Sequence, residues 1–204
     1  MAVSEEIRQR AVLLLEKFGR RNPSDPVMAF WDVELPNDEH EQAELAEAFD
    51  QLGVELFNRG ETQEALEAFW PNFLLRLRIV HRHPADRGAI RDFASAEDLI
   101  GLTFIALDKL DLAEQMLPEA LTYRRGLFED DPSDAHAAYL YGAALNHMGR
   151  LEHAKGNVEP ALVYYRQARD HLSEVDRMWS GVSYIEIELA EAVEWLGAIG
   201  TDHR

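Results

Sequence analysis

Glycine recurs in this chain at a fixed spacing of 48 residues, at Gly53, Gly101, Gly149 and Gly197. Other positions keep the same spacing and hold small or apolar residues each time. They form three sets: Ala46, Ala94, Gly142 and Ala190; Ala48, Ala96, Ala144 and Ala192; Leu52, Ile100, Met148 and Leu196. A fixed period of this length is typical of repeat proteins, in which each repeat is one supersecondary unit and neighbours share a core. The chain is therefore predicted to fold as a series of similar units.

Within each unit the apolar residues follow the period of a helix. The clearest series is Ala65, Leu66, Phe69, Phe73, Leu77 and Val80. Spacings of three and four positions place such residues on one helix face. Gly60 and Gly156 interrupt the pattern in mid-unit, and Pro84 and Pro132 end it. We predict an all-α chain with first helices at 39–58, 87–107, 135–155 and 182–199, and second helices at 62–82, 110–130 and 158–177.

The marks within each unit resemble those of the tetratricopeptide repeat (TPR). Phe49, Leu52 and Gly53, then Ala65 four residues before Phe69, and finally Pro84 follow its signature. In the second unit Glu97 replaces the first aromatic residue, and the third unit has no closing proline. The period of 48 residues exceeds the usual ~34 residues. In this respect the chain is similar to the long repeats of the kinesin light chain type. The resemblance covers residues 40–200 and implies an α-solenoid of helix-turn-helix repeats.

The two ends of the chain are expected to cap this array, because solenoid ends need protection from water. Residues 1–38 are predicted to hold a cap helix at about 4–19 and a connecting arm. The helix begins after Ser4 and carries an apolar stripe at Ile7, Ala11, Leu14, Leu15 and Phe18. The arm offers Phe30 and Trp31 as anchors. Residues 39–181 form the three repeats, and residues 182–204 form a closing helix.

Charge and composition exclude several partner classes. Asp and Glu outnumber Lys and Arg by 38 to 20, so the formal net charge is -18. A field of this sign repels nucleic acid and anionic membranes, and neither is expected as a partner. The absence of cysteine excludes disulfides, thiolate metal sites and cysteine nucleophiles. No targeting or membrane-spanning segment is visible, and a cytoplasmic protein is expected.

Sequence motifs of catalysis are missing. The chain has no phosphate-binding glycine loop, no zinc-protease helix and no nucleophile elbow, so we expect a protein that is not an enzyme and uses no cofactor. His81, His83 and Asp86 carry donor atoms that a metal could use. Residues two apart lie on different faces of a helix, and ordinary exposed histidines at a helix end are the favoured interpretation. A metal-dependent enzyme is kept as an alternative, with no metal ligand assigned.

The resemblance implies that the first helices line a concave groove in which a partner binds. The candidate groove residues are Asp50, Phe57, Asp98, Leu102, Asn146, His147, Arg150, His153 and Trp195. Family members that grip acidic C-termini use Lys, Arg and Asn there, and only Asn146 and Arg150 match. The other neighbours are largely acidic, so a basic or amphipathic segment is the favoured ligand. We expect an adaptor or scaffold module; the alternative is a regulatory sensor that binds a peptide or a small ligand.

The closing helix carries more apolar residues than one face can bury. Ile187, Val193 and Trp195 cannot all face the helix at 158–177. Some must therefore be exposed, and exposed apolar surface is typical of an interface. We expect this helix to be covered by a second copy in a homodimer or by the partner; the alternative is that Trp195 and Ile187 line the concave groove.

Overall fold

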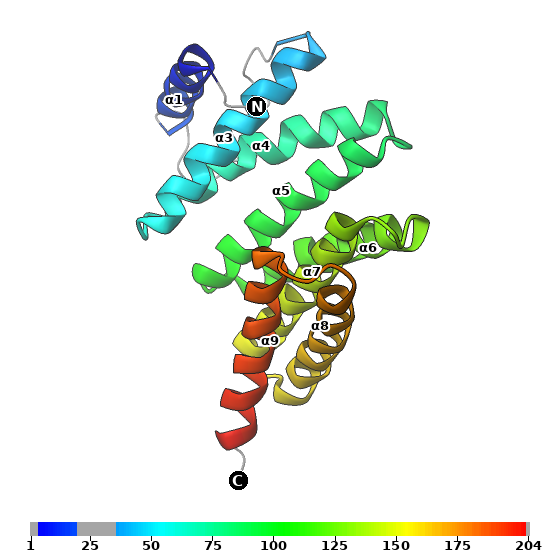
Figure 1. Cartoon of the computed structure of the whole chain (residues 1–204). Helices are drawn as coiled ribbons and strands as arrows, with labels where there is room; N and C mark the ends of the chain where they lie inside the picture. The colour runs from blue at the N-terminus through cyan, green and yellow to red at the C-terminus, as the bar shows by residue number, and fades with distance from the viewer. Residues whose placement is uncertain (1–3, 20–35, 203–204) are drawn as a thin grey trace. The chain divides into compact units, whose positions relative to one another are not determined.

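The computed structural model describes residues 4–19 and 36–202, and this part of the chain forms eight α-helices (Figure 1). Their bounds are α1 Glu5–Gly19, α3 Glu39–Asn58, α4 Thr62–Arg82, α5 Arg87–Ala106, α6 Leu110–Asp130, α7 Ala135–Ala154, α8 Val158–Met178 and α9 Ser183–Asp202. The predicted all-α class is confirmed, as is every predicted helix. The largest difference is the end of α9, which runs to Asp202 instead of residue 199.

The first helices of successive pairs start at equal intervals of 48 residues. Aspartate caps three of them: Asp38 accepts a hydrogen bond from Glu41 N, Asp86 from Ala89 N, and Asp134 from His136 N and Ala137 N, at 2.9 to 3.1 Å. These bonds satisfy backbone donors that the first turn of a helix leaves free. The capping residues share the spacing of the glycines, so the repeat in sequence is also a repeat in local structure.

The turns between first and second helices share a left-handed backbone position. Gly60 has φ 80°, Asp108 φ 55° and Gly156 φ 77°. Glycine adopts this region without steric penalty because it has no Cβ, whereas Asp108 carries one. The same sharp turn therefore recurs in each pair, with a less suitable residue in the second.

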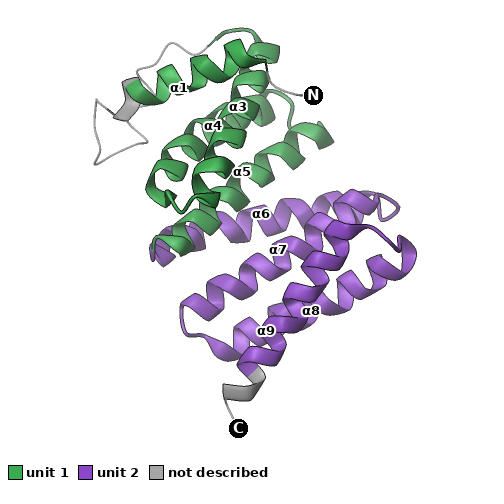
Figure 2. Ribbon diagram, turned by 60° about the vertical axis from the view of Figure 1, so that its left-hand side comes forward, with its two compact units in different colours: residues 1–107 green, residues 108–204 purple. Residues whose placement is uncertain are grey.

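The chain divides into two compact units, residues 1–107 and 108–204 (Figure 2). In unit 1, α1 packs against α3 and α4, and α3 packs against α4, which packs against α5. Ile7, Leu14 and Leu15 of the predicted stripe contact the buried core around Ala11 and Phe49, as expected. Phe30 and Trp31 lie outside the described residues, and so does the side chain of Phe18.

Unit 2 holds α6 to α9, and partly buried aromatic rings pack against its aliphatic core. Phe128, Tyr141 and His171 form a cluster with ring centroids 4.9 to 5.7 Å apart. His171 Nε2 donates a hydrogen bond to Ala138 O at 2.7 Å. Burial lowers the pKa of His171, so its neutral form is favoured in this contact.

At two of the four repeat glycines, a ring of the second helix approaches closely. A Cβ on Gly53 would lie 2.4 Å from Phe69 Cε1, and one on Gly149 would lie 2.5 Å from Tyr165 Cε1. The prediction that these glycines are packing residues is confirmed at both positions. It is wrong for Gly197, which has no atom within 4 Å of an added Cβ. The physical reason is that α9 is the last described helix, so no second helix covers it.

In the part of the chain that the structure describes, no helix combines the length and apolar character needed to cross a bilayer.

Candidate functional site

Unit 1 contains a cleft of about 450 Å³ between α3, α4 and α5. Its lining residues are Glu39, His40, Ala43, Arg76, Ile79, His83, Asp86, Gly88, Ala89 and Asp92. They come from the first half of α3, the last turns of α4 and the start of α5. Six of the ten are charged or histidine, so the cleft carries several ionisable groups beside a surface that is more apolar than polar.

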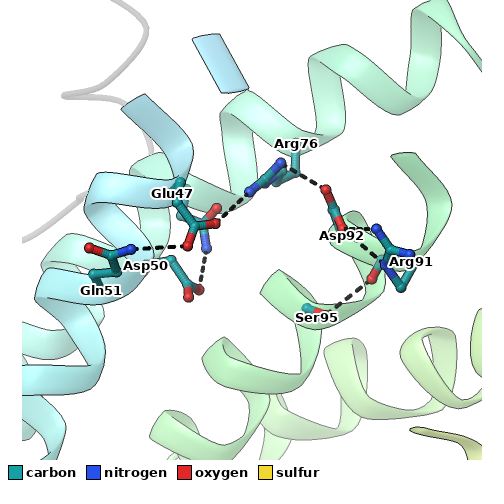
Figure 3. A network of polar contacts seen from close by, with 8 residues as sticks. Glu47, Asp50, Gln51, Arg76, Arg91, Asp92 and Ser95 are labelled. Carbon is teal, nitrogen blue, oxygen red and sulfur yellow. Dashed lines mark hydrogen bonds and ion pairs between the residues drawn. The ribbon is translucent and has the colours of Figure 1, made fainter. Parts of the chain in front are cut away.

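Arg76 is the central charge of the cleft. Its Nη1 lies 3.0 Å from Asp92 Oδ2 on α5, and its Nη2 lies 3.4 Å from Glu47 Oε2 on α3 (Figure 3). The Arg76 side chain is 13% exposed. One guanidinium therefore joins three helices. Two carboxylates already neutralise it, so it has little remaining capacity for an anionic ligand.

A buried carboxyl group lies beside this network. Asn72 Nδ2 donates a hydrogen bond of 3.0 Å to Asp50 Oδ1. Burial, and next the nearby charge of Glu47, raise the pKa of Asp50 from 3.8 to about 6. Gln51 Nε2 donates a hydrogen bond of 3.1 Å to Glu47 Oε1 (Figure 3). The carboxyl group of Asp50 is thus largely ionised at neutral pH and largely protonated in mild acid.

The rim of the cleft keeps its negative charge. Glu39 accepts hydrogen bonds from His83 Nε2 at 2.9 Å and from Arg82 Nη1 at 3.3 Å. The bond from His83 lowers the pKa of Glu39, and the bond from the backbone N–H of Ala89 lowers the pKa of Asp86. Both carboxyl groups therefore stay ionised at neutral pH. Asp92, which pairs with Arg76 and Arg91, is the third carboxylate of the cleft, so three carboxylates are set against three arginines, of which Arg76 lines the cleft itself.

The corresponding place in unit 2 is filled. The helices α7, α8 and α9 begin 96 residues after α3, α4 and α5. At this offset Tyr139 replaces Ala43 and Tyr184 replaces Gly88, and their ring centroids lie 4.5 Å apart. Leu172, which replaces Arg76, is completely buried. In unit 2 apolar side chains therefore take positions that line the cleft in unit 1, and α7 contacts α9 more extensively than α3 contacts α5.

In unit 1, the structure brings one sequence-predicted site residue to the cleft network. Asp50 belongs to that network. Phe57, near the end of α3, is exposed. On α5, Asp98 is buried and Leu102 is half-buried. None of these four lines the cleft itself.

In unit 2, α9 occupies much of the surface expected to face a partner. Asn146 is completely buried, and its Nδ2 donates to Glu188 O and Oε2, both at 2.9 Å. Arg150 pairs with both carboxylate oxygens of Glu191. These two residues, expected to recognise a ligand, instead join α7 to α9. Their polar groups thus make contacts within unit 2.

The remaining predicted residues of unit 2 form a half-buried aromatic group. Trp195 lies against His153 with ring centroids 4.8 Å apart, and it stacks on Tyr165 at 5.8 Å. His147 is half-buried on α7. Burial raises the pKa of Tyr165 far above its ordinary value, so the hydroxyl stays protonated. The group contributes packing between α7, α8 and α9.

Unit 2 has a cleft at another place. It measures about 390 Å³ and lies against α6, α7 and α8. Its lining residues are Leu121, Arg125, Tyr141, Leu145, Pro160, Val163, Tyr164 and Gln167. Apolar and aromatic side chains dominate it, and Arg125 supplies its charge.

The structure does not bring metal-ligand residues together in the way that a metal site requires. Within residues 4–19 and 36–202, no group of three or more His, Asp or Glu side chains is arranged to hold a metal ion. His81, His83 and Asp86 are exposed at the junction of α4 and α5, and His83 contacts Glu39.

Sequence reasoning missed most of the cleft. Glu39, His40, Arg76 and Asp92 carried no motif and were not proposed as a site. A signal was available in the comparison of residues 96 positions apart. Some cleft positions stand out as pairs in which the residue of unit 1 is small or polar and the residue 96 positions later, in unit 2, is aromatic or aliphatic.

No family model and no curated protein matches the chain. Among solved structures, a de novo designed helical repeat protein matches 98% of this chain and 99% of its own, with 12% sequence identity and a TM-score of 0.38. A likeness at this level carries no argument about function or ancestry. The description of the fold therefore rests on the helices themselves.

Proposed function

We propose that the chain is a protein-interaction module, an adaptor or scaffold, that binds a basic side chain of a partner in the cleft of unit 1. The observation that carries this proposal is the contrast at one structural position. Unit 1 keeps an open cleft lined by charged residues where unit 2 carries Tyr139, Tyr184 and the buried Leu172. Leaving such a position unfilled forgoes apolar burial, at about 25 cal/mol per Å², and a binding role would explain it.

The charges of the cleft support a cation as ligand. Arg76, Arg82 and Arg91 are already paired with Glu39 or Asp92, and the carboxylates of Glu39, Asp86 and Asp92 keep acceptor sites beyond these bonds. A Lys or Arg side chain in a basic or amphipathic peptide meets this requirement. Partners of opposite charge are also steered by the acidic field of the chain.

The finer interpretation of the fold belongs to the same proposal. In it, the helix pairs are TPR-like repeats of an α-solenoid with a 48-residue period. The equal spacing of helix starts, aspartate caps and left-handed turns supports this interpretation. Protein binding is the common use of such repeats, but a fold by itself does not give a function.

Selection from a peptide library tests the proposal. Peptides selected on the full chain are expected to be rich in Lys or Arg, and Ala43→Tyr is expected to weaken their binding about tenfold or more by filling the cleft as Tyr139 fills unit 2. Ala154→Tyr, on an exposed turn of α7, is the matched control. Selection of acidic peptides, or equal binding by both variants, would contradict the proposal.

A further inference from the structure

The outer face of α9 is open. The first helices α3 and α7, in contrast, are each covered by a second helix of their own unit. One face of α9 packs on α8 through Ile185, Ala192 and Ile199, which are buried. On the other side Ile187 is 65% exposed and Val193 is 51% exposed. These two residues confirm the expectation that part of the closing helix stays uncovered.

The open face has the same residue positions that α3 and α7 use to receive their second helices. On α3 these positions are Gln42, Ala46, Phe49 and Gly53; on α7 they are Ala138, Gly142, Leu145 and Gly149; all eight are buried. On α9 they are Glu186, Ala190, Val193 and Gly197, and all four are exposed. The face of α9 is therefore a helix-receiving surface without its helix.

The two occupied faces show what kind of helix fits. Phe69 of α4 covers Gly53, and Tyr165 of α8 covers Gly149, so closely that a Cβ on either glycine would overlap the ring. Each ring follows a completely buried alanine by four residues, Ala65 and Ala161. Gly197 offers the same space for a ring, and within residues 4–19 and 36–202 no atom lies within 4 Å of a Cβ added there.

We propose that the outer face of α9 binds an amphipathic α-helix of a partner protein, which places an aromatic side chain over Gly197 and an alanine one turn earlier. The exposed Glu186 and Glu194 beside the face favour a helix with basic flanks. This surface is separate from the cleft of unit 1 and does not depend on the function proposed for that cleft.

The sequence of α9 identifies a suitable probe within the chain. Residues 188–197 of α9 and 44–53 of α3 share the pattern Glu-Leu-Ala-Glu-Ala, then Leu-Gly at the end. The helix that α3 receives is α4, which carries Ala65, Phe69 and three arginines. An end-blocked synthetic peptide of residues 62–82 therefore has the shape and the charge that the proposal requires.

Fluorescence anisotropy with this labelled peptide and the full chain tests the proposal. Binding is expected, and it should weaken about tenfold or more when the peptide carries Phe69→Ala or the chain carries Gly197→Leu, since both remove the ring-over-glycine contact. Gly126→Leu is the matched control, because a side chain there also meets no atom within 4 Å. Circular dichroism of both chain variants should match that of the unchanged protein.

Three results would overturn the proposal. They are no binding of the peptide, binding that Gly197→Leu leaves unchanged, and a doubled mass in light scattering that Gly197→Leu returns to that of one chain. The last result would assign the face to a second copy of this protein.

Discussion

Two sets of three helices at corresponding positions differ in the residues at their centre. They are α3, α4 and α5 in unit 1 and α7, α8 and α9 in unit 2. In unit 1 an arginine joins the three helices through two carboxylates and leaves a cleft. In unit 2 a leucine at the same position lies in an apolar cluster against which Tyr139 packs. The comparison teaches that the helix arrangement tolerates either solution, so the polar one needs a reason other than stability.

Exchanging Arg76 and Leu172 should give the largest changes in stability, and the two changes should be unequal. Leu172→Arg places a charge at a completely buried position in an apolar cluster, and we expect a loss of about 3–5 kcal/mol in the free energy of unfolding. Arg76→Leu leaves only carboxylates that are partly exposed, and we expect a change within about 1 kcal/mol. Urea denaturation of both variants measures the asymmetry. Equal losses would mean that the two units do not differ as described.

Glycine replacements compare covered and uncovered first helices. Gly149→Leu must displace the ring of Tyr165, and we expect it to lose about 1–3 kcal/mol of stability through overpacking. Gly197→Leu meets open space, and a small gain from better helix propensity is expected. Thermal melting followed by circular dichroism separates the two. A large loss in Gly197→Leu would show that its surface is covered in solution.

Asp50 and Asn146 occupy the same position in the two units, and they differ by one ionisable group. Because the pKa of Asp50 in the folded chain, about 6, lies above its ordinary 3.8, the ionised group opposes folding above about pH 6, and this cost disappears as the pH falls toward 4. We expect Asp50→Asn to stabilise the protein by roughly 1 kcal/mol near neutral pH and to change little near pH 4. Urea midpoints at the two pH values provide the check, and a benefit that persists in acid would contradict this cause.

The smallest effect concerns the turn between α5 and α6. Asp108 has the positive φ that glycine holds in the turns at Gly60 and Gly156. We expect Asp108→Gly to stabilise the chain by a few tenths of a kcal/mol, because relief of backbone strain exceeds the added freedom of the unfolded state. A lower melting temperature in this variant would show that the aspartate side chain has a stabilising role.

Periodicity and breakers were sufficient to predict the helices, and even Pro71 and Pro118 inside α4 and α6 did not mislead. Those two helices continue because burial of their apolar faces outweighs one lost hydrogen bond each. The site was predicted far less well. Repeat alignment emphasises what the units share, whereas the cleft depends on where they differ, as between Ala43 and Tyr139. Asn146 and Arg150 matched a binding pattern, but the sequence could not show that α9 already pairs with them.

The central claim is that the cleft of unit 1 binds a cationic side chain and that its filled counterpart in unit 2 does not. Titrating the full chain with N-acetylarginine methylamide, and following the imidazole signals in NMR spectra, tests this directly. His40 and His83 line the cleft, and His136 stands 96 residues after His40 in unit 2. The account predicts that the signals of His40 and His83 shift, that those of His136 stay, and that Ala43→Tyr abolishes the shifts. Unchanged signals for His40 and His83, or equal shifts at His136, would contradict it.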